Sequence, residues 1–151
     1  IKPDQLTIVF GALILMVLLH LFLHRTKMGK AMRAMSDNMD LARVSGINTE
    51  RVIFWTWVIA AFLAAAAGIF LGIDTRLNPI MGWRLLLPVF AAAILGGIGS
   101  FYGAILGGLV IGIVQELSTL FISPAYKPAV AFAIMVLMLI VRPTGIMGGK
   151  E

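Results

Sequence analysis

The chain contains no cysteine and has few charged residues. Of its 151 residues, 13% are charged, whereas a typical soluble domain has ~25%. Without cysteine, a disulfide scaffold, a Cys-ligated zinc site and a cysteine nucleophile are all excluded. The sequence also lacks a phosphate-binding glycine loop with its lysine, a metal-ligand spacing, and a Ser–His dyad. We therefore predict that this chain is not an enzyme, holds no metal and binds no ATP through a P-loop.

Hydrophobic residues are present in large excess. They make up 60% of the chain, against about 45–50% in soluble domains, and the mean hydropathy is +1.01. The net charge of +5 comes from basic residues scattered between long apolar runs, which suits a membrane surface better than nucleic acid. The sequence thus predicts an all-α integral membrane protein surrounded by lipid, with no nucleic-acid partner.

Gaps between charges locate the membrane spans, because a bilayer core of ~30 Å needs about 20 apolar residues in a helix. The uncharged run 85–115 would form one helix of about 46 Å, too long for one crossing, and glycines interrupt its middle. It is therefore either a tight helical hairpin or a pair whose first limb is re-entrant. We predict about five transmembrane helices, at 5–23, 52–73, 85–98, 103–118 and 126–141.

Glycines occur in two patterns within these runs. The cluster that interrupts the long run is either a helix break bordering a translocation path or simple close packing; its residues are Gly96, Gly97, Gly99, Ser100 and Gly103. Small residues spaced by four, which let transmembrane helices approach closely, make up the second pattern. The helix-packing candidates are Gly68, Gly72, Gly107, Gly108 and Gly112.

The basic residues predict the orientation. The loop 24–51 holds half of the twelve lysines and arginines, so the positive-inside rule places it in the cytoplasm. With five crossings, Ile1 lies outside and Glu151 in the cytoplasm.

Methionines in this loop recur at helical spacing. Met28, Met32, Met35 and Met39 fall on one face of a helix, with charged residues opposite. Such a face either lies on lipid or beneath its own bundle, which the pattern alone favours, or fills a hydrophobic groove of a partner.

Helix-ending residues divide the same loop. Ser36 with Asp37 could instead cap a second short helix. Gly46 is expected to end the loop helix, and Asn48 with Glu50 to start the next span.

Three segments of the chain carry motifs that occur together in one known family. They are 29–48 running into 51–53, the run 92–100 with the glycines after it, and the end at 142–148. These segments resemble the permease subunits of bacterial branched-chain amino-acid ABC transporters, and the first is similar to the cytoplasmic loop of that family. Together they cover most of residues 25–148 in the family's order and spacing.

This resemblance implies a permease subunit of an ATP-driven, binding-protein-dependent importer in the bacterial inner membrane. The implied partners are a second permease subunit, two cytoplasmic ATP-binding subunits and a periplasmic substrate-binding protein. ATP would be bound by the partner, and no cofactor by this chain. The resemblance favours docking over lipid packing for an amphipathic coupling helix within 28–47, with coupling residues Gly29, Met32, Met35, Ser36, Asp37, Met39, Ala42, Gly46 and Ile47.

The length differs from the family pattern. Such permeases are about twice as long, so we expect that these 151 residues alone do not transport. Three alternatives stay open: a related ABC importer of urea, amides or other amino acids, a secondary transporter, and a non-transporting membrane scaffold. A secondary transporter would need ionisable groups in mid-span, and the sequence has none there.

Overall fold

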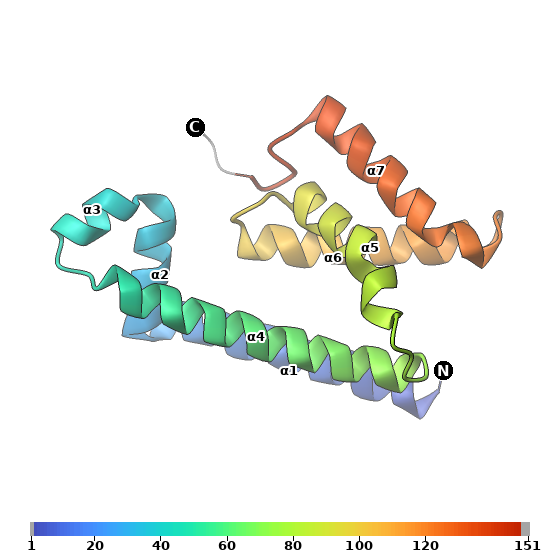
Figure 1. Cartoon of the computed structure of the whole chain (residues 1–151), viewed down its shortest axis with the longest axis horizontal. Coiled ribbons are helices and arrows are strands. Elements are labelled where there is room, and N and C mark those ends of the chain that lie inside the picture. Colours follow the sequence, from blue (N-terminus) through green and yellow to red (C-terminus); the bar gives the residue numbers. More distant parts are fainter. Residues whose placement is uncertain (1, 149–151) are drawn as a thin grey trace. The chain divides into compact units, whose positions relative to one another are not determined.

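The computed structural model describes residues 2–148, and within this range every regular element is a helix (Figure 1). The predicted all-α fold class is therefore confirmed. The chain divides into two units, one up to Leu77 and the other from Asn78. Ile1 and Glu151, whose sides of the membrane the sequence predicts, lie outside the described residues.

The first unit consists of two long apolar helices joined by two short ones. Both long helices are long and apolar enough to cross a membrane, and they contain the predicted spans 5–23 and 52–73. They pack along each other, and their remaining surface is almost wholly exposed. The elements are α1 (Pro3–Arg25), α2 (Lys27–Asp37), α3 (Met39–Val44) and α4 (Thr49–Asp74).

Side-chain caps decide where the helices of this unit begin. Thr26 has an extended backbone that ends α1, and its hydroxyl oxygen accepts the N–H of Gly29, 3.0 Å away. At the other end of the loop, Asn48 Oδ1 accepts the N–H of Arg51 at 3.1 Å and starts α4. The predicted start of the second span at Asn48 is thus confirmed.

The loop between α1 and α4 differs from the continuous helix predicted through Met39. α2 ends at Asp37, and Asn38 caps α3 by accepting the N–H of Leu41 at 3.0 Å. The prediction of one continuous helix is wrong. The alternative of a second short helix is confirmed by α3, but its cap is Asn38 and not Ser36, which lies inside α2. An asparagine side chain competes with the helical backbone for hydrogen bonds, so the helix restarts at this residue.

The second unit contains the other three apolar helices and one turn of 3₁₀-helix. Its core is formed by Ala91, Leu95, Ile111 and Ala131. The elements are α5 (Met81–Gly96), α6 (Phe101–Ser118), η1 (Pro124–Tyr126) and α7 (Lys127–Val141). Two segments of 18 residues are long enough for a crossing: one is α6, and the other is η1 together with α7. α5 has 16 residues, about 24 Å of helix.

α5 and α6 are two helices joined at the glycine cluster, as both predicted alternatives, a hairpin of two crossings and a re-entrant first limb, require. Gly96 lies against Gly103, and Ala92 against Gly107. Along this contact the later residue of α6, Gly107, lies against the earlier residue of α5, Ala92, so the two helices run antiparallel. α5 begins at Met81, before the predicted start at residue 85, and ends at Gly96 rather than residue 98. Arg84 is therefore part of the helix, because a charge in the first turn does not prevent helix formation.

Candidate functional site

The methionines of α2 lie on the side of the helix that faces its own unit. Met28, Met32 and Met35 are half-buried, whereas Lys30 and Arg33 are exposed. α2 contacts both α1 and α4. Gly29 is buried, and a Cβ there would overlap the backbone of α1 at Phe22 and Leu23. α2 is thus fixed beside the membrane helices through its methionine face.

The exposed apolar residues of this loop lie on α3 instead. Leu41 is 64% exposed and Val44 87%, whereas Ala42 is only 4% exposed. Leu41 and Val44 are three residues apart, so they are neighbours on one side of the helix, and Ala42 points to the opposite side. We call Leu41 and Val44 the α3 patch. Met39 is exposed to a smaller extent, 38%, and at helical spacing it lies on the other side of α3 from these two residues.

Both ends of α3 are closed by hydrogen bonds. At the N-terminal end Asn38 provides the cap. At the C-terminal end Gly46 adopts a φ of +86°, which favours glycine, and its N–H donates to Arg43 O. The N–H of half-buried Ile47 donates to Ala42 O at 3.1 Å. The predicted end of the loop helix at Gly46 is therefore confirmed, and α3 holds the α3 patch in one orientation.

The remaining predicted coupling residues do not share one surface. Ser36 and Asp37 are at the end of α2, where Asp37 is exposed, whereas Met32, Met35 and Ala42 face inward. The structure therefore divides the predicted set between two helices and two directions. Sequence reasoning did not single out Leu41 and Val44, although both follow the Asn38 cap that sets the direction of α3.

The glycine cluster allows close contact between α5 and α6. A Cβ on Gly96 would overlap the carbonyl oxygen of Gly103, and one on Gly107 would overlap that of Ala92. Because these neighbours are backbone atoms, they cannot rotate away as a side chain would.

The turn between the two helices depends on residues that tolerate unusual backbone angles. Gly97 and Gly99 have φ of +101° and +90°, which side chains disfavour. Ser100 then caps α6, its hydroxyl accepting the N–H of Gly103 at 3.1 Å. The turn is thus a defined helix break, and a role beside a translocation path stays a prediction.

Other glycines predicted to pack helices have open surroundings. Within the described residues, a Cβ on Gly68, Gly108 or Gly112 would meet nothing within 4 Å, and one on Gly72 would meet the side chain of Leu77 at 3.0 Å. Their role in packing against other helices remains a prediction.

The segment that follows α7 is hydrogen-bonded to the C-terminal end of α5. The N–H of Ile146 donates to Leu95 O at 2.8 Å, and that of Met147 donates to Gly96 O at 3.0 Å. These bonds satisfy two carbonyls that a helix end leaves free. Gly145 has a φ of +77° and lies so close to Gly97 that a Cβ would overlap its backbone. We call residues 145–147, which contact the end of α5, the C-terminal strap. Sequence reasoning did not predict this contact, and the only signal for it in the sequence was the glycines that follow Pro143.

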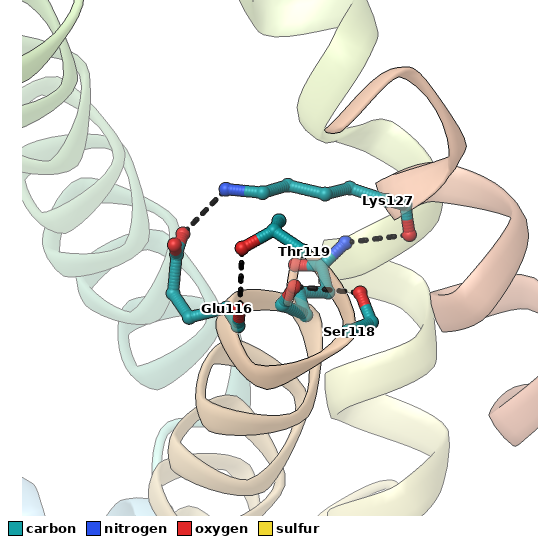
Figure 2. Close-up of polar contacts among 5 residues, drawn as sticks. Glu116, Ser118, Thr119 and Lys127 are labelled. Carbon is teal, nitrogen blue, oxygen red and sulfur yellow. Dashed lines mark hydrogen bonds and ion pairs between the residues drawn. The ribbon is translucent and has the colours of Figure 1, made fainter. Parts of the chain in front are cut away.

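At the opposite end of the second unit, α6 and α7 are joined by an ion pair (Figure 2). Lys127 Nζ lies 2.5 Å from Glu116 Oε1, and Gln115 Nε2 donates to Lys127 O at 3.0 Å. Thr119 and Ser118 turn their hydroxyls back to carbonyls of α6. The Glu116 side chain is 73% exposed, so it belongs to the helix end and not to a buried proton path.

Because Glu116 is exposed, the ion pair contributes little to stability. We expect Glu116→Gln to lower the free energy of unfolding by less than about 1 kcal/mol, with the effect vanishing at high salt. Thermal unfolding in detergent at two salt concentrations measures this. Asp40→Asn, at another exposed carboxylate near a helix end, is the control. A salt-independent loss several times larger would contradict the surface placement.

Charged side chains are confined to the ends of the described membrane helices. Asp, Glu, Lys and Arg occur only in the first or last turns of α1, α4, α5, α6 and α7. Among residues 2–148 no group of three or more His, Asp or Glu could hold a metal ion.

Comparison with known families gives a match over nearly the whole chain. Residues 3–139 match a family model described as a branched-chain amino acid transport system permease component. No solved structure matches the chain.

Curated relatives carry related names. The chain is 45% identical over 137 residues to the high-affinity branched-chain amino acid permease LivH of Escherichia coli K12, covering 90% of the chain and 44% of LivH. It is 39% identical over 148 residues to the permease BraD of Pseudomonas aeruginosa, covering 97% and 48%. The fructose import permease FruG of Bifidobacterium longum is 29% identical over 149 residues, covering 93% and 44%. The chain thus spans about half the length of the curated relatives it matches.

Proposed function

Because the chain belongs to the branched-chain amino acid transport permease family, we propose that it forms part of the membrane pathway of an ATP-driven importer of these amino acids. It is a multi-pass membrane protein of a family of transport permeases, which are not themselves enzymes. The observation that carries the proposal is the family match over residues 3–139, which spans almost everything from α1 to α7.

The proposed partners bind ATP, bind the substrate outside the cell and complete the membrane pathway. They are a second permease subunit, two cytoplasmic ATP-binding subunits and a periplasmic substrate-binding protein. The absence of a P-loop from the sequence supports a separate subunit for ATP binding. In this arrangement no cofactor is bound by the chain itself.

We place the loop between α1 and α4 in the cytoplasm of a bacterial inner membrane. Its share of the basic residues supports this orientation. If α5 and α6 both cross, the turn at residues 97–100 and the strap after Arg142 lie on the cytoplasmic side. The Glu116–Lys127 pair then lies at the periplasmic end, and the first residues of α1 lie outside.

The proposed mechanism is a population shift. ATP binding closes the two ATP-binding subunits, and the loop segment 28–47 moves with them. This motion changes the balance between outward-open and inward-open arrangements of the membrane helices. If the α5 limb is instead re-entrant, the helix break at residues 96–103 lies within the membrane and is proposed to border the pathway, because non-helical backbone at that depth needs a protein or water environment.

Branched-chain amino acids are the favoured substrates. The chain is 45% identical to a permease named for them and 29% identical to one named for fructose. A secondary transporter is disfavoured because the described spans carry no Asp, Glu, Lys or Arg in their middle turns.

A competition assay tests the substrate class. The permease polypeptide that contains this sequence is reconstituted into vesicles with its ATP-binding subunits and binding protein, and uptake of labelled leucine is measured. Excess isoleucine or valine is expected to suppress the uptake, whereas fructose and urea leave it unchanged. Absence of leucine uptake, with ATP hydrolysis stimulated by another solute, would overturn the substrate and keep the architecture.

A further inference from the structure

The exposed apolar side chains between α6 and α7 point to a contact with lipid. We call residues 119–123, which join α6 to η1, the α6–α7 turn. We propose that this turn lies in the headgroup region of the bilayer and inserts Leu120 and Phe121 among the acyl chains of one leaflet. The inference goes beyond the proposed function, because it depends on the membrane spans and not on what the permease carries.

Exposure and composition distinguish the α6–α7 turn from a loop that faces water. Phe121 is 89% exposed and Leu120 is 73% exposed. No Asp, Glu, Lys or Arg occurs among residues 117–126, whereas the segment that joins α4 to α5 begins with exposed Asp74 and Arg76. Exposed apolar clusters mark contacts with membranes or with other proteins. Leu120 and Phe121 therefore need a covering that water does not provide.

Many polar groups of the α6–α7 turn find their hydrogen-bond partners within the chain. The backbone N–H groups of residues 119–122 donate to carbonyl oxygens of residues 116–118 over 2.8–3.1 Å. The hydroxyls of Ser118 and Thr119 also donate to carbonyl oxygens of α6, each at 2.7 Å (Figure 2). In an apolar medium, backbone groups have to be satisfied internally. These donors therefore lose no hydrogen bonds when the turn leaves water.

The α6–α7 turn continues the apolar surface of the membrane spans. It joins two segments that are long and apolar enough to cross a membrane, α6 and η1 with α7. Ile113 and Leu117, four residues apart on one side of α6, are exposed just before the turn. Exposed Tyr126 follows it, and tyrosine is enriched where membrane proteins pass from lipid to water. The apolar side chains of the turn thus extend a surface that already faces lipid.

The neighbouring charges favour lipid over a protein partner. Glu116 and Lys127 flank the α6–α7 turn and pair with each other, so neither charge is left to complement a partner. A protein interface usually has a polar rim around its apolar centre, and the turn itself carries no charged residue. Charged side chains at the ends of membrane segments reach the headgroup region instead. The turn therefore fixes the depth of α6 and α7 in the bilayer.

Spin-label accessibility in bilayer discs tests the proposal. Phe121→Cys, as the only cysteine of the full-length permease, carries a nitroxide in discs of phosphatidylethanolamine and phosphatidylglycerol. Oxygen concentrates in lipid and a nickel chelate in water, so the ratio of oxygen to nickel-chelate accessibility reports the surroundings. We expect a ratio above one for Phe121→Cys, and likewise for Leu120→Cys as a second probe. Lys30→Cys is the control, because Lys30 is exposed on the charged face of α2, and its ratio is expected to be below one.

Two other outcomes would refute the contact with lipid. A ratio below one at both turn positions would place the α6–α7 turn in water, and low accessibility to both reagents would place it beneath another protein. The helix content and thermal midpoint of each labelled variant are expected to match those of the unlabelled permease, because Leu120 and Phe121 are exposed. Transport is not part of the readout, so failure of the proposed function would leave this result intact.

Discussion

Alanine at Gly107 is expected to open the α5–α6 hairpin, whereas alanine at the adjacent Gly108 leaves it closed. A Cβ on Gly107 would overlap the carbonyl oxygen of Ala92 and come within 2.8 Å of the Gly96 nitrogen, but one on Gly108 would meet nothing within 4 Å. The neighbours of Gly107 are backbone atoms, so relief requires the two helices to move apart.

The expected cost for Gly107→Ala is about 3 kcal/mol, the upper end of the range for overpacking. Gly108→Ala is expected to be neutral, or to stabilise the helix by about 0.5–1 kcal/mol, since glycine is a poor helix former. Unfolding of the chain in mixed micelles, followed by helix content as denaturing detergent is added, measures both. Equal stability of the two variants would contradict the close contact at Gly107.

Alanine at Gly145 is expected to release the strap from the end of α5. The residue has a φ of +77°, which costs about 1–2 kcal/mol for a side chain. Its Cβ would also overlap the backbone of Gly97. Both effects act against the hydrogen bonds that Ile146 and Met147 donate to α5.

Hydrogen exchange at these two amides measures the release, and we expect them to lose most of their protection in Gly145→Ala. Gly99→Ala is the control, because Gly99 shares the positive φ but a Cβ there would meet nothing within 4 Å. Its strain is confined to the turn, so the amides of Ile146 and Met147 should stay protected. Unchanged exchange in Gly145→Ala would show that the strap is not held as described.

Most of the helical architecture follows from local sequence patterns. Charges interrupt the apolar runs close to the ends of α1 and α4, because lipid-exposed helices exclude charge. Glycines 97 and 99 predict the break between α5 and α6, since each adopts a positive φ there. Asn48 caps α4 as its residue type predicts.

Two features were not predictable from these patterns. The periodicity of the methionines continues through Met39, yet the cap at Asn38 starts a new helix, so Met39 leaves the methionine face. Side-chain competition at one residue thus overrides a hydrophobic period. The strap on α5 depends on hydrogen bonds between residues about fifty positions apart, which no local pattern records.

The central claim is that the permease acts in an importer driven by ATP through partner subunits. Leucine uptake is measured in vesicles that contain the permease polypeptide with this sequence, its ATP-binding subunits and external binding protein. ATP is present or absent inside, and ionophores abolish any ion gradient. We expect uptake to require both ATP and the binding protein and to persist with the ionophores. Uptake that follows an ion gradient without ATP would contradict this account and identify a secondary transporter.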